Sequence, residues 1–384
     1  MYISRLSIRN WKNFTKTETS FSETVYLIGP NASGKSNFLD IFRFMRDIVA
    51  PKGGGLQQAL ASRGGLRKIR SLAARQKPRI ELEFEFRESF SNLDVDPDWK
   101  YILWINYEGK GKQRPVVLKE EAHKRNRRLF TRPDHDDKND PDRLTQTHLE
   151  QINMNREFRQ IAAFFEQVLY LHLLPQLLKF SDQLSLRHLE SDPFGQGFLE
   201  AISKTTPRTR DSRLSKIETI LLRVIPNLEQ LRFIKDIVTG RPHLEMLYSH
   251  WRPKAGWQRE DQFSDGTLRL IAMIWTLLSS NSMILLEEPE LSLHKKVVEQ
   301  IPNLIYKARQ SRKKSGGQIL ISTHSEAMLS SKSIDGNYLI LKPGAGGEAT
   351  RIEEPTKTDN IAMSSGLSPA DVLIPKTSST IRQV

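Results

Sequence analysis

The amino-acid sequence predicts an α/β fold in which a mixed or parallel core sheet is joined by an antiparallel β lobe and a helical insertion. Two apolar runs, MILL at 283–286 and QILIS at 318–322, stand between helical patterns, which is typical of parallel strands buried on both faces. The run IELEFEF at 80–86 alternates apolar and acidic residues, as a strand with one solvated face does. A glycine-rich loop joins the apolar run VYLI at 25–28 to a helical pattern.

The N-terminal part is predicted to contain several strands and one long helix. The run YISRLSI at 2–8 is the first strand, and NWKNF at 10–14 turns the chain toward the strand at 25–28. Residues 36–49 carry apolar side chains at helical spacing, and a triple glycine ends that helix. The run YILWINY at 101–107 is expected to lie beside the alternating strand.

The remainder of the chain mixes loops, helices and further strands. Residues 131–142 combine aspartates, a histidine and two prolines, and their consecutive placement favours a solvated loop over a metal site. Residues 148–180 are helix-like with one possible strand at VLYLHLLP, and residues 181–215 favour loops with short helices. The last elements are strands at 231–238 and 243–249, helices at 267–278 and 292–309, and a hairpin near 337–341.

Composition narrows the class of protein. The chain of 384 residues has no cysteine, so disulfides and thiolate metal sites are excluded and an intracellular setting is expected. No apolar stretch reaches the length of a membrane span, which predicts a soluble, cytoplasmic protein without a membrane partner. The net charge of +13 favours a polyanion as ligand, although a basic chain also suits a protein that only binds nucleotides.

The segment GPNASGKS at 29–36 completes the pattern GxxxxGK[ST] between a strand and a helix. Backbone N–H groups of such a loop, here from Asn31 to Asn37, can surround phosphate oxygens at the positive end of the helix dipole. Lys35 is expected to reach the β- and γ-phosphates of a nucleotide, and the Ser36 hydroxyl to ligate Mg²⁺. An ordinary glycine-rich turn is the alternative.

Adjacent carboxylates follow the apolar strand MILL. Glu287 and Glu288 stand at its carboxyl end, where nucleotides bind in α/β sheets. We expect Glu287 to hold the Mg²⁺ shell and Glu288 to orient and polarise the attacking water. The alternative for both residues is the start of a solvated helix.

Two further segments offer polar groups to an anion. His324 follows the strand QILIST and is placed to hydrogen-bond to a γ-phosphate, although a lone histidine is more often structural. Ser264, Asp265 and Gly266 precede an amphipathic helix, so free N–H groups are available there, or the serine is merely an N-cap.

The ordered motifs IGPNASGKSN, FSDGT, LLEEPELSLH and STHS resemble the ABC-type ATPase head of the SMC and RecF group. The likeness is to the AAA-like branch with OLD-type and bacterial anti-phage ATPases. It implies a head-to-head homodimer with two ATP molecules and Mg²⁺, in which Ser264 and Gly266 contact the γ-phosphate in trans. It also implies that Lys12 lies near the nucleotide and Gln176 contacts the metal as the glutamine loop. The D-loop of the family corresponds to residues 291–294.

The sequence departs from the family at several positions. Ala32 replaces a common glycine, Glu287 replaces an aspartate, and SDG replaces a doubled glycine. The insertion between Asn37 and Ser264 is too short for a long SMC arm, and no Toprim nuclease is evident after His324.

These observations predict three parts and one leading function. The parts are an N-terminal ATPase lobe at 1–90, a β and helical insertion with a basic segment at 91–225, and a C-terminal ATPase lobe at 226–384. Two basic segments, 63–79 and 108–132, suggest contact with a DNA or RNA backbone, or else a solvated face or an acidic partner. The leading function is an ATPase whose ATP-dependent dimerisation controls a DNA-directed activity, with a nuclease partner in bacterial anti-phage defence. The alternatives are a RecF-like DNA repair ATPase and a nucleotide-binding scaffold with little turnover.

Overall fold

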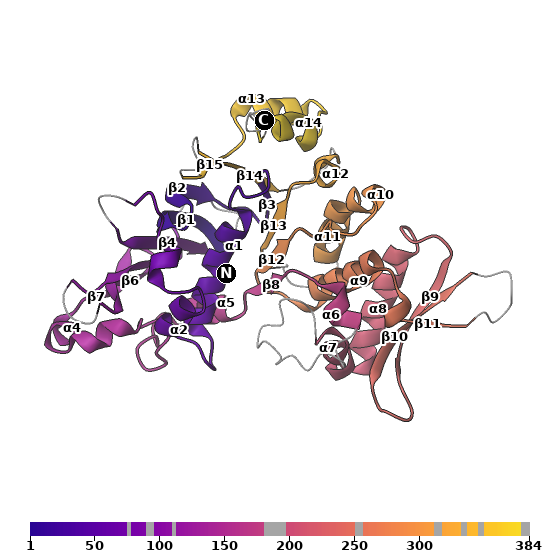
Figure 1. Ribbon diagram of the computed structural model, residues 1–384, viewed down its shortest axis with the longest axis horizontal. Helices are drawn as coiled ribbons and strands as arrows, with labels where there is room; N and C mark the ends of the chain where they lie inside the picture. Colours follow the sequence, from indigo (N-terminus) through magenta and orange to yellow (C-terminus); the bar gives the residue numbers. More distant parts are fainter. Residues whose placement is uncertain are drawn as a thin grey trace.

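The computed structural model describes residues 1–74, 78–89, 96–109, 113–179, 197–249, 256–310, 317–331, 336–344 and 349–377. In this part of the chain the strands form two six-stranded sheets and one three-stranded sheet. Figure 1 shows the antiparallel six-stranded sheet at one end of the molecule, the second six-stranded sheet in the middle and the three-stranded sheet at the other end. The predicted α/β class, with a core sheet and an antiparallel β lobe, is confirmed.

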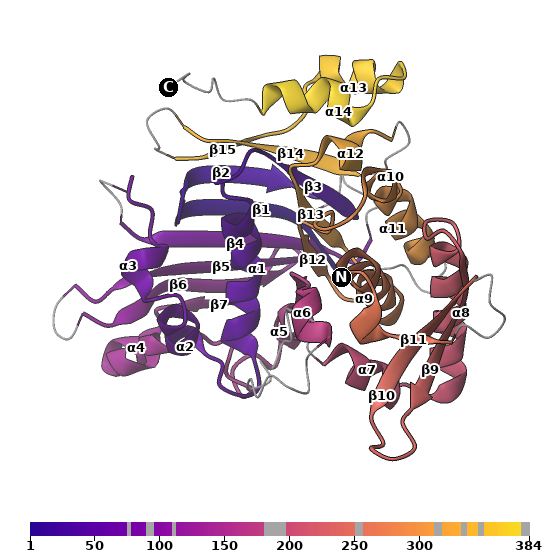
Figure 2. The ribbon, with the colours of Figure 1, turned by 45° about the vertical axis from the view of Figure 1, so that its right-hand side comes forward.

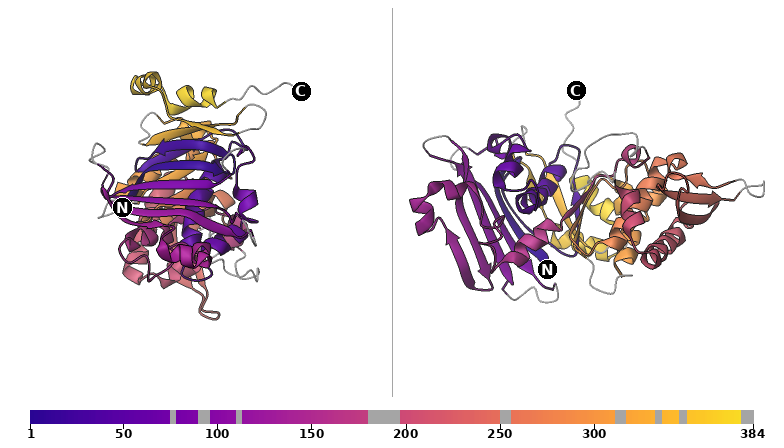
Figure 3. Two further views of the ribbon diagram at one scale, coloured as in Figure 1. Left: turned by 90° about the vertical axis from the view of Figure 1, so that its left-hand side faces the viewer. Right: turned by 90° about the horizontal axis from the view of Figure 1, so that it is seen from below.

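The antiparallel sheet has the strand order β2-β1-β4-β5-β6-β7 and faces the viewer in the left-hand view of Figure 3. Along β4 (Ile80–Arg87) the apolar side chains are buried and the acidic side chains lie on the other face, as predicted. The sequence analysis missed β2, because polar residues dominate it; its Thr17 and Thr19 nevertheless occupy the buried face. The other strands are β1 (Tyr2–Trp11), β2 (Phe14–Ser20), β5 (Trp99–Tyr107), β6 (Pro115–Lys124) and β7 (Arg127–Arg132).

The core sheet has the order β15-β14-β3-β13-β12-β8. Its strands pair in parallel except for β15, which is antiparallel to β14, so the sheet is mixed as predicted. The two runs expected to be buried on both faces are the interior strands β12 and β13, which lie next to each other in this sheet. The strands are β3 (Thr24–Ile28), β8 (Leu169–Leu171), β12 (Ile284–Glu287), β13 (Ile319–Thr323), β14 (Asn337–Lys342) and β15 (Arg351–Glu353).

Helices cover both faces of the core sheet. Helices α1 (Lys35–Val49) and α5 (Arg159–Glu166) lie between it and the antiparallel sheet, as Figure 2 shows for α1. The Phe84 ring of β4 lies 6.3 Å from the Phe42 ring of α1 and 5.1 Å from the Phe165 ring of α5. On the opposite face of the core sheet, α9 (Asp265–Ser279) and α11 (Ile301–Gln310) pack against its strands and form a second hydrophobic core.

The rest of the chain forms a helical end and short connecting helices. The three-stranded sheet, in the order β11-β10-β9, packs with α7 and α8 beyond α9. None of the helices in the described ranges combines the length and apolar character that crossing a bilayer requires. The bounds are α2 (Leu56–Ala61), α3 (Leu66–Ile69), α6 (Pro175–Lys179), α7 (Phe198–Lys204), α8 (Pro207–Leu221), β9 (Leu228–Lys235), β10 (Pro242–Tyr248), β11 (Gln258–Arg259), η2 (Glu260–Gln262), α10 (Lys295–Val298), α12 (Glu326–Leu329), α13 (Lys357–Ser364), α14 (Pro369–Leu373) and η4 (Ile374–Lys376).

The segment 131–142 is mostly exposed to solvent, as predicted, but the prediction that it forms a loop is wrong. This segment forms α4 (His135–Asn139) and the start of the 3₁₀ helix η1 (Pro141–Thr145). Asp134 closes a capping box at the start of α4, and the carboxylate of Asp137 is buried in an ion pair with Arg132. The sequence alone does not show that one aspartate of this run, Asp137, pairs with a buried arginine, and this is why a loop was predicted.

Two other expectations need adjustment. The helix expected at 292–309 is divided into α10 and α11, because Pro302 lacks the backbone N–H that a continuous helix would use. The fifteen-residue helix α8 begins within the segment 181–215, which was expected to form loops with short helices, and ends beyond it. Residues 181–196 of this segment lie outside the described residues. Strands β4 and β5, which the sequence analysis assigned to different parts of the chain, pair with each other in the antiparallel sheet, and the division of the chain into three parts stays a prediction.

Candidate functional site

The glycine loop lies at the carboxyl end of β3 and leads directly into α1. Gly34 is the N-cap residue of α1 and has φ +99°, in the left-handed region that glycine favours. Ala32 also has a positive φ of 62°, so the residue that departs from the family pattern adopts a glycine-like conformation. A Cβ at Gly29 would lie 2.6 Å from Ser33 Oγ and 2.7 Å from the Leu341 carbonyl oxygen. The compact turn therefore requires glycine at both ends.

Lys35 is folded back over the loop that precedes it. Its Nζ donates hydrogen bonds to the carbonyl oxygens of Gly29 at 2.8 Å and Pro30 at 3.0 Å. The side chain is buried, and burial lowers the pKa of its ammonium group, while nearby carboxylates counteract part of this shift. These carboxylates belong to Glu288, Glu290 and Glu287. A buried cation held only by carbonyl oxygens is ready to exchange them for phosphate oxygens.

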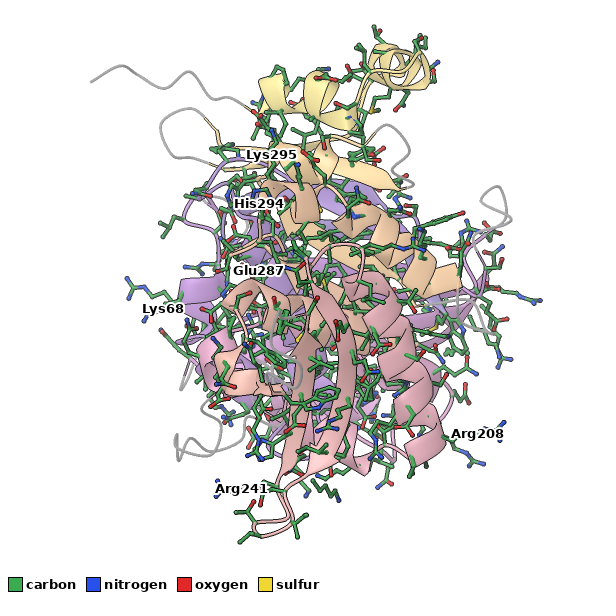
Figure 4. All side chains as sticks on the ribbon, turned by 90° about the vertical axis from the view of Figure 1, so that its right-hand side faces the viewer. Lys68, Arg208, Arg241, Glu287, His294 and Lys295 are labelled. Carbon is green, nitrogen blue, oxygen red and sulfur yellow. The ribbon has the colours of Figure 1, made fainter. Side chains whose placement is uncertain are left out.

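Ser36 and Glu287 meet, as the sequence analysis expected of a pair that holds Mg²⁺. The Ser36 hydroxyl donates to one carboxylate oxygen of Glu287, and the Tyr170 hydroxyl donates to the other. Burial raises the pKa of Tyr170, and its hydrogen bond to Glu287 raises it further, so the phenol stays protonated. A hydroxyl and a carboxylate are hard oxygen ligands that fit Mg²⁺, which completes its shell with water and phosphate oxygens. Figure 4 labels Glu287 near the middle of the molecule.

Glu288 and His324 lie side by side at the ends of β12 and β13. His324 Nδ1 is 3.4 Å from Glu288 Oε1, and both side chains are partly exposed. Glu288 has a φ of +44°, and its N–H donates to the Ser322 carbonyl oxygen at 3.1 Å, which fixes the turn after the strand. The structure thus brings together the two residues that the sequence analysis chose as catalytic.

Glu290 connects the same two strand ends, and the sequence analysis missed it. Its Oε1 accepts from the Thr323 hydroxyl at 2.6 Å and from the His324 N–H at 3.3 Å. Burial raises the pKa of Glu290, although these hydrogen bonds oppose the shift. The only sequence signal was a third acidic residue in EEPE, which its neighbours obscured.

Ser264, Asp265 and Gly266 form the turn at the start of α9, which we call the signature turn. Ser264 is exposed and caps the helix, since its Oγ accepts from the Thr267 N–H at 3.1 Å. Gly266 packs against the chain after β12: a Cβ there would lie 2.5 Å from the Ser292 carbonyl oxygen. Residues 291–294, the expected D-loop, therefore touch the signature turn of the same chain. His294 and Lys295 lie at the exposed start of α10, as Figure 4 shows.

Two residues that the resemblance placed near the nucleotide make other contacts. Gln176 Nε2 donates to Asp265 Oδ2 at 3.0 Å, in the turn at the start of α9, whereas Tyr170 contacts Glu287, which the sequence analysis predicted to hold the metal. Lys12 Nζ pairs with Asp40 of α1 at 2.7 Å. The roles of Gln176 toward the metal and of Lys12 toward the nucleotide stay predictions. The remaining loop residues Asn31, Ala32 and Ser33 lie between β3 and α1, and Asn37 lies in the first turn of α1.

Comparison with known proteins agrees with this arrangement. A family model described as "AAA domain, putative AbiEii toxin, Type IV TA system" matches residues 25–330, from β3 to α12. The DNA replication and repair protein RecF of Synechocystis sp. is 30% identical over 90 residues. That match spans 23% of this chain and 23% of the RecF protein, so most of each lies outside it.

Solved structures of SMC head domains share the fold. The SmcHead bound to the C-winged helix domain of ScpA has a TM-score of 0.57 with 16% identity, over 94% of this chain and 100% of that chain. An Smc head domain with an extended coiled coil, bound to the C-terminal domain of ScpA derived from Pyrococcus furiosus, has a TM-score of 0.52 with 12% identity, over 95% and 98%. At such identities the likeness concerns the fold alone. The chain belongs to the AAA domain family whose model matches it, within the SMC/RecF-like group of ABC-type ATPases.

Proposed function

We propose that the chain binds ATP with Mg²⁺ and hydrolyses it at this site. The observation that carries the proposal is that three groups meet at the carboxyl ends of β3, β12 and β13. They are a glycine loop of the phosphate-binding pattern, a hydroxyl–carboxylate pair and a carboxylate–imidazole pair. These are Lys35 with its loop, Ser36 with Glu287, and Glu288 with His324. Each supplies one part of phosphoryl transfer to water.

The residues take distinct roles in this proposal. Lys35 and the loop N–H groups hold the β- and γ-phosphates, and Ser36 and Glu287 hold Mg²⁺, which supplies positive charge to the phosphate oxygens. Glu288 orients a water molecule and accepts its proton, because its partly exposed carboxylate lies beside Glu287 in the sequence and beside His324 in space. His324 hydrogen-bonds to the γ-phosphate and so registers its presence. Glu290 positions His324 through the contacts with Thr323.

Binding and turnover test this proposal directly. Full-length protein is titrated with Mg²⁺–ATP by calorimetry, and phosphate release is followed over time. Wild type should bind and hydrolyse ATP, Lys35→Ala should lose binding, and Lys52→Ala, at an exposed position, should behave as wild type. Absence of ATP binding by the folded wild type would refute the proposal. Binding with turnover far below the usual range of about 1–1,000 per second would instead favour the scaffold alternative.

The proposed switch is an ATP-dependent homodimer. Ser264 is exposed at the start of α9, and the first N–H groups of a helix have no partners within that helix, so a γ-phosphate held by another copy can bind there. A ligand held by both copies favours the closed dimer by its differential affinity alone. A shift from 1% to 99% closed requires about 5.5 kcal/mol, which two γ-phosphates, each making several charge-assisted hydrogen bonds, can supply.

The proposed setting is bacterial anti-phage defence in the cytoplasm, with a nuclease as effector and DNA as its target. The description of the matched family names a toxin–antitoxin system, which supports a defence role. Affinity purification of the tagged chain from its native host, with and without a trapped ATP state, tests the effector. Recovery of a nuclease that depends on ATP supports this setting, and recovery of no second protein in either state argues against it.

The second candidate is a RecF-like ATPase that acts on DNA by itself. Besides the RecF match, the turn between β6 and β7 exposes a run of basic residues: Lys124, Arg125, Arg127 and Arg128. Residues 110–112 and 75–77 of the two basic segments lie outside the described residues. Binding that neutralises five or six phosphates predicts a slope of about −5 in log affinity against log salt. ATP-dependent binding with such a slope supports this candidate, and failure to bind DNA at low salt excludes it.

A further inference from the structure

Thr350 contacts the glycine loop from the far end of the chain. It lies just before β15 and is 4% exposed. Its hydroxyl donates to the Ser33 carbonyl oxygen at 2.9 Å, and its backbone N–H donates to the Asn13 carbonyl oxygen at 2.7 Å. Two segments more than 300 residues apart, the turn before β2 and the strand hairpin β14–β15, therefore meet at the back of the loop.

Asn13 completes this contact. Its Nδ2 donates to the same Ser33 carbonyl oxygen at 3.2 Å and to the Thr350 hydroxyl at 2.6 Å. Its Oδ1 accepts from the Asn37 side chain at 2.9 Å, so both ends of the amide are engaged. The network is closed: the threonine hydroxyl accepts from one partner and donates to another. We call Asn13 and Thr350 the Ser33 clasp.

The clasp also explains why Gly34 must be glycine. A Cβ at Gly34 would lie 2.0 Å from Asn13 Nδ2, which no side chain can approach without displacing the asparagine. The amide of Asn13 thus lies directly against the backbone of the loop. The glycine of the motif serves this close approach in addition to its positive φ.

The orientation of one peptide bond follows from these contacts. In a trans peptide the carbonyl of Ser33 and the N–H of Gly34 point in opposite directions. Two donors hold the Ser33 carbonyl toward the clasp, so the Gly34 N–H is directed away from the clasp. A loop with this peptide already oriented need not reorganise when a phosphate binds.

We propose that Asn13 and Thr350 are positioning residues that set the loop for phosphate binding, so that nucleotide affinity depends on the C-terminal hairpin. This inference rests on the proposed ATP site, and it assigns neither residue a contact with the nucleotide. Because the loop holds phosphates common to ATP and ADP, the clasp strengthens the binding of both. It leaves the hydrolytic step to Glu288 and His324.

Three substitutions in the full-length chain test the clasp. Thr350→Val removes the hydroxyl at nearly constant volume, Thr350→Ser keeps it, and Thr19→Val is the matched control. Thr19 is also buried, and its Oγ1 has no hydrogen-bond partner among the described residues. The readouts are the dissociation constants of Mg²⁺–ATP and Mg²⁺–ADP, kcat at saturating ATP, and thermal stability.

Thr350→Val should raise the dissociation constants of both nucleotides by about 5- to 30-fold, the effect of one lost hydrogen bond to a buried carbonyl. kcat at saturation should stay at the wild-type value, and Thr350→Ser and Thr19→Val should bind as wild type. Unchanged affinity of Thr350→Val, with or without lower thermal stability, overturns the clasp and leaves the proposed ATPase intact. Should Thr350→Val not fold, Asn13→Ala must show the same loss of affinity for both nucleotides, and wild-type affinity there is equally decisive. If the wild type binds neither nucleotide, the proposed function and the clasp fail together.

Discussion

Charged side chains are buried in two regions of this molecule, and their partners differ. In the antiparallel lobe, Arg132 donates to both oxygens of Asp137 at 2.8 and 2.9 Å and to Glu120 at 3.2 Å. Backbone carbonyl oxygens accept its remaining N–H groups. Glu120 accepts in turn from the Tyr101 hydroxyl at 2.8 Å and from two backbone N–H groups. Next to this cluster, Nε2 of His148 has no hydrogen-bond partner among the described residues, and burial lowers the pKa of that ring to about 4, so the ring carries no charge.

At the carboxyl ends of the core strands, the buried charged groups do not pair with each other in this complete way. Three carboxylates surround Lys35, which is bonded to carbonyl oxygens instead. Three buried oxygens, Ser33 Oγ, Glu290 Oε2 and Ser322 Oγ, have no hydrogen-bond partner among the described residues. Buried charged groups whose hydrogen bonds are all made within the chain stabilise the fold. Buried polar groups that lack partners indicate a site where a ligand supplies them. Mg²⁺ and a nucleotide would supply the missing partners.

The largest expected effect is at the site. Glu288→Gln removes the proposed proton acceptor and should lower ATP turnover by about 10²- to 10⁴-fold. Because Glu288 is partly exposed and the ion pair it makes among the described residues is with the exposed His324, stability should change by less than about 0.5 kcal/mol. Phosphate release and thermal unfolding measure the two quantities, with the exposed Glu229→Gln as control. Wild-type turnover in Glu288→Gln would remove the assigned role.

The second largest effect is expected in the antiparallel lobe, where substitution of Arg132 should lower stability without acting on ATP hydrolysis itself. Arg132→Met leaves Glu120 and Asp137 buried without their cation, at a cost of about 3–5 kcal/mol in the free energy of unfolding. Arg128→Met, at an exposed position of the same strand, should cost about 0.5 kcal/mol or less. Urea unfolding measures both values. An Arg132→Met variant as stable as the wild type would show that the lobe cluster does not hold the fold.

The stability of the antiparallel lobe should depend on pH, because the partly buried carboxyl group of Glu150 has no cationic partner within the described part of the chain to stabilise its charged form. Burial raises the pKa of Glu150 from 4.5 to about 7, although its carboxylate accepts from the Leu56 N–H at 2.7 Å. The folded state therefore binds this proton more tightly than the unfolded chain does. The contribution of Glu150 to stability is lost as the pH rises from about 4.5 through 7, and the full cost is present above 7. Glu150→Gln does not titrate, so its advantage should grow from near zero at pH 4 to at most about 3 kcal/mol at pH 8. An advantage that is constant with pH would contradict the shift.

The smallest expected effect concerns Tyr170. Tyr170→Phe removes the hydroxyl that donates to Glu287 and should raise the Mg²⁺ concentration needed for half-maximal turnover by about 2- to 10-fold. Tyr306→Phe, at a residue that is 45% exposed, is the control. Identical Mg²⁺ dependence in Tyr170→Phe and wild type would show that Glu287 needs no such support.

The sequence predicted the parts of the site that follow one another along the chain. The strand, loop and helix at Lys35, the carboxylates after β12 and His324 after β13 are local patterns, and parallel pairing brings the ends of these strands together. Contacts that depend on tertiary packing were missed. Tyr170 lies on a short edge strand, and Asn13 meets Thr350 across most of the chain. Asp137 was assigned to a loop because its ion pair with Arg132 is created only by folding.

The central claim is that two copies of the chain share each nucleotide, and the mass of a hydrolysis-deficient variant in solution tests it most directly. Glu288→Gln is measured by sedimentation with Mg²⁺–ATP, with Mg²⁺–ADP and without nucleotide, alone and combined with Ser264→Arg. The account predicts that ATP alone doubles the mass of Glu288→Gln, and that the double variant binds ATP as tightly per chain at low concentration but remains a monomer. A monomer of Glu288→Gln at saturating ATP, or a dimer that forms equally well with Ser264→Arg, would contradict the shared site.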